Sequence, residues 1–436
     1  GWLPWVSTSH LKGIAGLREF DAALFERLKA PSGAVAAGGS QSMADDAKGP
    51  PAPPREGAAP VSRAELEAEI RIKMARVQKF LREQKLEGVL LSAVNNFSWM
   101  TAGLADNHVV ITSETGAASL LVAADGRKFA VASNSEMPRL MAEDLKGLGY
   151  ERREFKWYED KIAPDRKLAL IREIAGGGEV GSDTPYDGLK DVGAQFARLR
   201  YELTESEMKK YRWLGRNTAE AVVSVCRRIQ PGMTEYEMEA MASDELLRRG
   251  IRPTVLLMGV DERVLSFRHT VPSGARLRHY AFVNVCARKW GLVTSTGRFV
   301  YFGELPGDLR QRVHASAQVT ARFLANTRPG ARAGEILERS KAWFAENGFP
   351  GEMELHHQGG AIGYAEREWV AFPGSKEVVH DRQAFAWNPI VQGALSFDTF
   401  ILNGGRFENI GFVEGWPSIH VDVNGQDVEL PDILVR

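Results

Sequence analysis

Cysteine is nearly absent from this chain. Only Cys226 and Cys286 occur among its 436 residues, in segments whose patterns are typical of a helix and an internal strand. So few thiols in such places argue against a disulfide framework and fit a reducing compartment. We therefore predict a cytoplasmic protein.

Long apolar runs and blocks of like charge are also missing. No stretch approaches the ~20 apolar residues that a membrane-spanning helix needs, and the amino terminus has no basic region followed by an apolar core. The formal net charge is -1, with lysine and arginine interspersed among aspartate and glutamate. Nucleic-acid binding requires a concentrated basic surface instead. We expect neither a membrane nor a nucleic acid as a partner.

Apolar residues are plentiful enough for several folded cores. They make up 44% of the chain, and its length exceeds the usual size of one domain. The first segment, 1–42, has apolar residues three or four apart between Ser9 and Ala30, which predicts an amphipathic helix followed by a flexible linker. Two interpretations stay open, a native extension and a fused leader or peptide. A fused peptide would be a partner or substrate segment held beside the protein.

Residues 43–62 are rich in proline and alanine. Such a composition cannot bury enough apolar surface to order itself. We predict a disordered tether between the first segment and the folded domains.

Helical and strand patterns alternate over residues 63–202. Arg63 to Lys85 has apolar residues at helical spacing, and Gly88 to Ala93 is an apolar run bounded by turn signals. This alternation predicts an α/β domain with a mixed sheet. The other expected elements are a polar turn at 95–99, strands at 108–112, 118–123 and 128–133, a helix over 135–148, and a final strand and turn around 179–186.

Residues 203–436 begin with two capped helices. Thr204 or Ser206 can cap a helix whose first turn is acidic. Pro231 to Glu235 (PGMTE) then ends this helix and starts another. The stretch Pro329 to Glu335 repeats the plan of helix, Pro-Gly, helix. This duplication predicts a domain of two pseudo-symmetric halves.

The order of these elements resembles the superfamily of creatinases, prolidases and methionine aminopeptidases. The PGMTE turn and its repeat carry the resemblance in the second domain, and the strand order carries it more diffusely in the first. It implies an amino-terminal creatinase-like α/β domain with a mixed sheet, followed by a pseudo-symmetric α+β pita-bread domain. It also implies a homodimer in which the amino-terminal domain of one subunit covers the active cleft of the other.

Two segments match metal-binding motifs of the superfamily with altered ligands. In 282–300 (FVNVCARKWGLVTSTGRFV), Asn284 and Ser295 stand where metal-dependent members carry two aspartates, eleven residues apart. The stretch 356–364 (HHQGGAIGY) resembles the His-Gly-x-Gly signature, with His357 as the one retained ligand.

A third segment, 384–399 (AFAWNPIVQGALSFDT), has Asn388 and Phe397 close to where the superfamily carries glutamate ligands. One imidazole among neutral side chains cannot offset the cost of dehydrating divalent cations. The resemblance therefore implies a protein without a bound metal or cofactor, similar in this respect to creatinase. We interpret Asp398 as a structural carboxylate in a strand turn, and a displaced metal ligand is the alternative.

Loss of the metals leaves acid–base catalysis available. Creatinase works on this fold without metal and uses a histidine to move a proton, and the corresponding residue here is His269. A neutral imidazole with a pKa of ~6.5 accepts and returns protons near neutrality. His269 is our candidate general acid or base, and a histidine that caps the loop is the alternative.

His356 and His357 are adjacent in the sequence. In an extended strand they would point to opposite faces, so only one would face the pocket. The glycines at 359, 360 and 363 allow a ligand to approach the backbone closely. This pattern predicts a substrate-lining loop, in which His357 assists catalysis, and a tight turn is the alternative.

Charged and aromatic side chains complete the predicted site. An arginine holds a carboxylate at two points, and a glutamate accepts hydrogen bonds from an amine or guanidinium. Solvated charges, structural ion pairs and core aromatics are the alternative interpretations. The predicted catalytic residues are His269, His357 and Glu368. The predicted substrate-binding residues are Arg268, Arg288, Arg298, His356, Tyr364, Glu366, Arg367, Trp387 and Phe397.

Three functions are compatible with the sequence. The preferred one is a metal-independent hydrolase or lyase-type enzyme that acts on a C–N bond of a small amino-acid-like, guanidino or peptide substrate. The second is a catalytically inactive protein that binds a peptide in the same cleft. The third is a metal-dependent Xaa-Pro aminopeptidase or dipeptidase.

Overall fold

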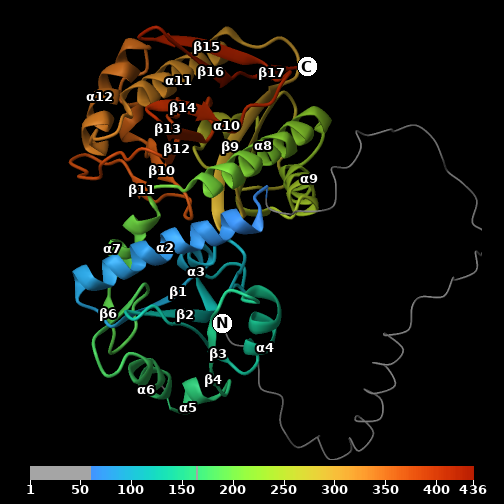
Figure 1. Cartoon of the computed structure of the whole chain (residues 1–436). Coiled ribbons are helices and arrows are strands. Elements are labelled where there is room, and N and C mark those ends of the chain that lie inside the picture. The colour runs from blue at the N-terminus through green and yellow to red at the C-terminus, as the bar shows by residue number, and fades with distance from the viewer. Residues whose placement is uncertain (1–59, 164) are drawn as a thin grey trace, which may run out of the picture. The chain divides into compact units, whose positions relative to one another are not determined.

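Figure 1 shows the computed structural model of the chain, which describes residues 60–163 and 165–436. The predicted amphipathic helix within 1–42, and with it the proposed partner segment, lies outside the described residues. The same holds for residues 43–59 of the predicted tether.

Residues 63–202 fold around one six-stranded sheet. Its strands run in the order β4-β3-β2-β1-β5-β6, with β1–β2 and β2–β3 antiparallel and the other pairs parallel. The predicted mixed sheet is confirmed. The strands are β1 (Gly88–Ala93), β2 (Thr115–Ala123), β3 (Lys128–Ser133), β4 (Glu151–Phe155), β5 (Val180–Ser182) and β6 (Lys190–Asp191). The helical segments are α2 (Arg63–Gln84), α3 (Val94–Met100), α4 (Met137–Arg139), η2 (Leu140–Asp144), α5 (Glu159–Ile162), α6 (Asp165–Ile174), α7 (Gly193–Ala197) and η3 (Arg198–Arg200).

The central strand β1 contributes to a core on each face of this sheet. Val89 and Leu91 pack with Val77 of α2 in one buried cluster, whereas Leu90 packs with Ile171 of α6 in another. Successive side chains of a strand point to opposite faces, so one apolar run serves both cores. Helices α2 and α3 therefore cover one face and α6 the other (Figure 1).

The predicted polar turn at 95–99 is wrong, because these residues belong to helix α3. The carboxylate of Asp183 accepts hydrogen bonds from the amides of Ser92 and Ala93 and from the side chain of Asn96. Asp183 follows β5 and is far away in the sequence. The helix start thus depends on a partner that a local pattern does not reveal.

Two other predictions in this domain also differ from the structure. Residues 108–112 form bends and turns rather than a strand, and Val110 and Ile111 are 61% and 74% exposed. This apolar run does not enter a core, so nothing favours an extended pairing there. The predicted helix over 135–148 is limited to α4 and the π-helical turn η2, where the Leu145 amide bonds the Leu140 carbonyl.

The second domain opens with α8 (Glu205–Arg228) and α9 (Glu235–Arg248). The Thr204 hydroxyl accepts from the Glu207 amide, while the Glu207 carboxylate accepts from the Thr204 amide. Thr234 and Glu237 form the same reciprocal pair at the start of α9. Such capping boxes satisfy amides that have no partner inside the helix. The predicted cap at Thr204 and the PGMTE turn are confirmed.

The rest of this domain repeats one plan, in which two helices precede a sheet (Figure 1). All strand pairs of the two sheets are antiparallel except β9–β17, which is parallel. The sheets have the orders β17-β9-β8-β7 and β11-β10-β12-β13-β14, and β15 and β16 form a separate hairpin. The first half contains β7 (Arg252–Val260), α10 (Glu262–Ser266), β8 (Tyr280–Lys289) and β9 (Leu292–Tyr301). The second half contains α11 (Gly307–Asn326), α12 (Ala333–Glu346), η4 (Glu352–Glu354), β10 (Gly359–Ile362), β11 (Trp369–Val370), β12 (Gln383–Trp387), β13 (Phe400–Asn403) and β14 (Arg406–Asn409). The chain continues through β15 (Ser418–Val423), β16 (Gln426–Pro431) and β17 (Leu434–Val435).

A buried charge network connects α2, α8 and the loop after β10. The Lys73 ammonium lies 2.8 Å from the Glu207 carboxylate, and the Lys210 ammonium lies 2.9 Å from that of Glu69. The Tyr364 hydroxyl donates to Glu207 at 2.8 Å. All five side chains are buried. Burial alone would raise the pKa of Glu207, but the charges of Lys73 and Lys210 outweigh it and hold the pKa at about 2.

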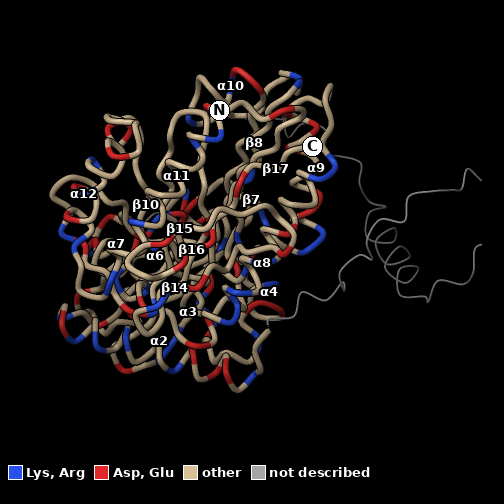
Figure 2. Tube along the Cα trace, turned by 90° about the horizontal axis from the view of Figure 1, so that it is seen from above, with Lys and Arg blue, Asp and Glu red and all other residues tan. Residues whose placement is uncertain are grey.

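Acidic and basic residues alternate along the described chain without a block of one sign (Figure 2). None of the helices within residues 60–163 and 165–436 is both long and apolar enough to cross a bilayer.

Candidate active site

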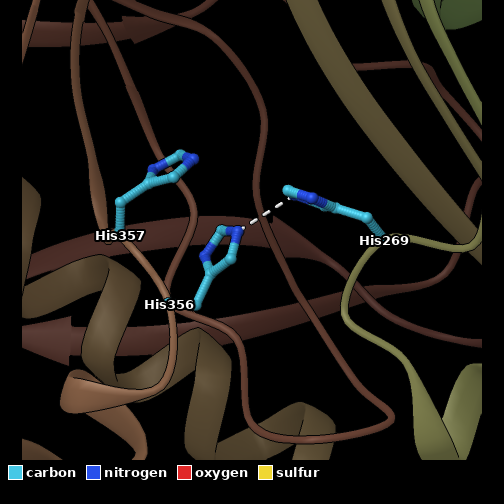
Figure 3. A group of neighbouring side chains, drawn as sticks. All are labelled: His269, His356 and His357. Atoms are coloured by element: carbon cyan, nitrogen blue, oxygen red, sulfur yellow. Dashed lines mark hydrogen bonds between the residues drawn. The ribbon is translucent and has the colours of Figure 1, made fainter.

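Three histidines from two loops lie side by side in the second domain. His269 follows the short helix α10, and His356 and His357 follow the turn η4. Nε2 of His269 lies 3.1 Å from Nε2 of His356, and the rings of His356 and His357 stack with centroids 4.2 Å apart. One nitrogen of each ring lies within 4.8 Å of the other two (Figure 3). The structure therefore brings these three predicted site residues together.

The expectation that His356 and His357 point to opposite faces is wrong. Strand β10 begins only at Gly359, and the chain bends at His356. The buried side-chain amide of Gln358 stabilises this bend by donating to the carbonyls of Met353 and His356. Because side chains alternate only along an extended strand, both rings reach the same side here.

The surroundings of His356 and His357 disfavour protonation. Burial, followed by the charges of His357 and His269, lowers the pKa of His356 to about 3. Burial, followed by the positive charge of Arg367, lowers the pKa of His357 to about 4. Desolvation penalises an imidazolium more than a neutral ring. Both rings are therefore neutral at pH 7, and each has one nitrogen with a lone pair.

Arg367 connects the histidines with one of the former ligand positions. Its Nη2 donates to Oδ1 of Asn388 at 3.2 Å, and its Nη1 donates to the carbonyl of Glu366. Burial lowers the pKa of Arg367 from 12.5, yet a guanidinium stays charged in proteins. A fixed positive charge thus stands next to Asn388, where a glutamate would hold cations in the superfamily.

The four altered ligand positions do not fit a dinuclear metal centre. Asn284 and the buried ring of Phe397 both border Gly297. Ser295 accepts a weak hydrogen bond from a thiol, and Asn388 accepts from a guanidinium. None of these side chains carries negative charge, which hard divalent cations require.

Strand β10 supplies no ligand to these positions. A Cβ at Gly359 would overlap the side chain of Asn388, and one at Gly360 would overlap the carbonyl of Trp369. His357, the predicted retained ligand, precedes the strand, and its Nδ1 accepts a hydrogen bond from the Gly359 amide at 3.3 Å. The strand therefore leaves room for backbone alone beside Asn388.

Asp398 is a structural carboxylate rather than a displaced ligand. It forms a buried two-point ion pair with Arg298, with Nη1–Oδ1 and Nη2–Oδ2 distances of 2.8 and 3.0 Å. Arg298 also donates to the carbonyl of Gly411. The predicted role of Arg298 in substrate binding is corrected, because both of its Nη atoms are engaged inside the domain.

Glu368 and Tyr364 are also engaged elsewhere. Glu368, predicted as catalytic, forms a buried ion pair with Arg200 at 2.6 Å and accepts from the Tyr364 amide. The Tyr364 hydroxyl donates to Glu207 in the buried charge network. Both predictions are corrected, since these polar groups hold the two domains together.

Trp387 and Phe397 are core residues rather than pocket walls. The Trp387 ring stacks on Phe323 with centroids 4.6 Å apart, and its Nε1 donates to the hydroxyl of Thr327. Only 1% of Trp387 and 2% of Phe397 is exposed. Neither side chain has surface left for a substrate.

Arg268, Arg288 and Glu366 are more accessible. Arg268 pairs with Glu352, just ahead of the two adjacent histidines. Arg288 lies 3.5 Å from Glu366 in a partly exposed ion pair. Such pairs are weaker than buried ones and can exchange partners with a charged ligand.

A cavity of about 1130 Å³ adjoins Arg288 and Glu366, and the sequence analysis missed it. Its other side is formed by the first domain, including Asn95, His108 and Asp183. Asn95 and Asp183 follow the ends of β1 and β5, which was the signal available in the sequence. Among the described residues, the three clustered histidines are not part of this lining.

One family model matches part of the chain. Residues 209–421 match the sequence model of metallopeptidase family M24. No curated protein sequence matches the chain.

Solved structures with the same fold include a dipeptidase from Mycobacterium ulcerans and a prolidase from Pyrococcus horikoshii. The dipeptidase is 16% identical over 84% of this chain and 98% of its own, with a TM-score of 0.66. The prolidase is 15% identical over 78% of this chain and 98% of its own, with a TM-score of 0.65. The amino-terminal domain of the FACT complex subunit SPT16 from chickpea is 11% identical over 79% of this chain and 96% of its own, with a TM-score of 0.59.

The family match covers both halves of the second domain, and the structural similarity extends over most of the described residues. Residues 209–421 therefore match metallopeptidase family M24, which is consistent with the superfamily of creatinases and prolidases, and the second domain has the pita-bread fold.

Proposed function

We propose that this chain is an enzyme that breaks a C–N bond in a small amino-acid-like, guanidino or peptide substrate by acid–base catalysis, without a dinuclear metal centre. The observation that carries the proposal is the hydrogen-bonded pair of His269 and His356 in a domain whose former ligand positions are all uncharged.

The proton would be carried by His269. In a hydrolysis, a water oxygen forms a bond with the substrate carbon while His269 takes a proton from that water. The same proton is then transferred to the departing nitrogen as the C–N bond breaks. Protonated His269 can donate its Nε2 proton to neutral His356, which stabilises the imidazolium.

The positive charges of Arg367 and Arg288 suit a substrate with a carboxylate. Among the described residues, Nε of each guanidinium has no hydrogen-bond partner although it is buried. Unpaired buried donors of this kind favour an incoming anionic group. A carboxylate bound there would replace part of the ion pair between Arg288 and Glu366.

The test is an activity screen on chelator-treated protein with creatine, Xaa-Pro dipeptides and peptides that have proline at the second position. The matched variants are His269→Gln and His420→Gln, since His420 is an exposed histidine on β15 paired with Asp427. Turnover should persist in chelator and fall by about 10²-fold or more in His269→Gln alone. Full turnover by His269→Gln would refute the proposal.

Peptide binding without turnover is a second candidate. It is favoured by the internal ion pairs that occupy Glu368 and Arg298, and by the similarity to the SPT16 domain. Saturable binding of a peptide whose dissociation is unaffected by His269→Gln, with no product formed, would support this function over the enzyme.

A metal-dependent Xaa-Pro peptidase is a third candidate, because similar structures are named dipeptidase and prolidase. It requires stoichiometric metal at positions that here lack carboxylates. Activity that appears only after addition of manganese, cobalt, zinc or iron, and that is lost in Asn284→Leu, would favour it.

A further inference from the structure

We propose that His269, His356 and His357 form a mononuclear site for a divalent transition-metal ion of the zinc class. His269 and His356 stand at none of the superfamily's ligand positions, and His357 alone resembles a retained ligand. The site would therefore be distinct in composition from the dinuclear carboxylate centre of the superfamily.

The distances among the three rings suit such an ion. Tetrahedral zinc with Zn–N bonds of ~2.05 Å holds its nitrogen ligands roughly 3.3 Å apart. The Nε2 atoms of His269 and His356 are 3.1 Å apart. One nitrogen from each of the three rings falls within 4.8 Å of the others (Figure 3). Small side-chain rotations would bring His357 to the same separation.

The donor set selects the class of metal. Three neutral imidazoles suit zinc, copper, nickel and cobalt, whereas magnesium, calcium and manganese prefer oxygen ligands. Three protein ligands leave a fourth position open for water or another small ligand.

The surrounding loop is partly prepared for binding. Gln358 fixes the bend that presents His356 and His357 together. One rearrangement is needed, because Nδ1 of His357 accepts a hydrogen bond from the Gly359 amide. Coordination through Nε2 moves the ring proton to Nδ1 and opens that bond. We therefore expect weaker binding than in a closed structural zinc site.

Metal binding would regulate the proposed enzyme. Coordination takes up a nitrogen lone pair of His269 and so prevents this ring from moving protons in the proposed reaction. Zinc should therefore inhibit turnover, and a chelator should restore it. This consequence rests on the proposed function, whereas the binding itself does not.

The test uses the full chain after chelator treatment, titrated with Zn²⁺ by calorimetry and with Co²⁺ by visible absorption. We expect one ion per chain and cobalt bands typical of four-coordinate geometry. Each of His269→Gln, His356→Gln and His357→Gln should weaken binding at least tenfold, whereas the exposed control His420→Gln should not. Thermal unfolding gives a second measurement, since the same concentration of Zn²⁺ should raise the Tm of the wild type more than that of each of the three variants.

Unchanged zinc affinity in all three variants, or equal weakening in His420→Gln, would overturn the proposal. Two of the three side chains are exposed, so the substitutions should leave the protein folded. The Tm of each variant without metal checks this. Zinc binding in a protein without turnover would support the metal site and refute only the proposed enzymatic function. Turnover in a protein that binds no zinc would support the enzymatic function and refute the metal site.

Discussion

Arg298 and Asp398 neutralise each other inside the second domain. Their two hydrogen bonds measure 2.8 and 3.0 Å, and 2% and 1% of the two side chains is exposed. The carboxylate that could have served a metal thus balances a guanidinium. Removal of either charge would leave the other buried without a partner.

We expect Asp398→Asn to lower the free energy of unfolding by about 3–5 kcal/mol, the usual effect of breaking a buried pair. Urea denaturation measures this loss. The control is Glu262→Gln, which removes an exposed partner of Arg278 and should change stability by less than about 1 kcal/mol. If Asp398→Asn lowers the free energy of unfolding as little as Glu262→Gln does, the ion pair of Asp398 with Arg298 does not stabilise the protein.

Glu207 should make the protein sensitive to acid. Its pKa is lowered from 4.5 to about 2 in the folded protein, so folding favours the ionised carboxylate. The resulting stability is present above pH ~4.5 and is lost as the pH falls towards 2. Glu207→Gln should therefore reduce stability at pH 7 and flatten its decline over this interval, as measured by urea denaturation at several pH values.

Glu237 is the matched control for Glu207. Both residues complete a capping box, but Glu237 is exposed and, within residues 60–163 and 165–436, has no ion pair with a buried lysine. Glu237→Gln should cost about 1 kcal/mol or less, typical of a helix cap. Equal effects of the two substitutions would contradict a stabilising role for the buried network.

Glu368 and Arg200 should behave as a structural pair. Glu368→Gln and Arg200→Gln should each destabilise the protein, and the double variant should lose less than the sum, with a coupling energy of about 1–3 kcal/mol. A double-mutant cycle from chemical denaturation measures this value. If Glu368→Gln leaves the stability unchanged, Glu368 is not a structural residue and is again a candidate catalytic residue.

Gly103 should tolerate no side chain. Its φ is +72°, and an added Cβ would overlap the backbone of Trp290. Gly232 has a φ of +94° with no atom within 4 Å of the added Cβ. We expect Gly232→Ala to cost about 1–2 kcal/mol for its conformation, and Gly103→Ala to cost a further ~1–3 kcal/mol for the overlap. Thermal or urea unfolding of both variants tests this difference.

Local signals in the sequence predicted much of the fold. The cap at Thr204, the PGMTE turn between the first two helices of the second domain and the apolar strand at 88–93 were identified, because each depends on neighbours a few residues away. The apolar run at 109–111 failed for the opposite reason. Its side chains are exposed in the structure, and the sequence alone does not show which apolar residues remain exposed.

The candidate site was less predictable, because its residues depend on distant partners. The convergence of His269 with His356 required two loops that are 87 residues apart. Arg298 could be excluded from the site only once its partner Asp398, 100 residues away, was known. The shared direction of His356 and His357 required the bend that Gln358 stabilises. Residue type suggested the chemistry in each case, and long-range packing decided which side chains were free.

The buried network of Lys73, Glu69, Lys210, Glu207 and Tyr364 has a consequence for work with shortened chains. Cutting the protein near residue 203 would leave Lys73 and Glu69, which also pair with each other, on one fragment and Glu207 and Lys210 on the other. The ion pairs Lys73–Glu207 and Lys210–Glu69, which are buried in the whole chain, would then be split between the two fragments, and their charged groups would be exposed or left buried without these partners. The pita-bread domain alone is therefore expected to be an unstable expression product, and the two domains should melt in one cooperative transition.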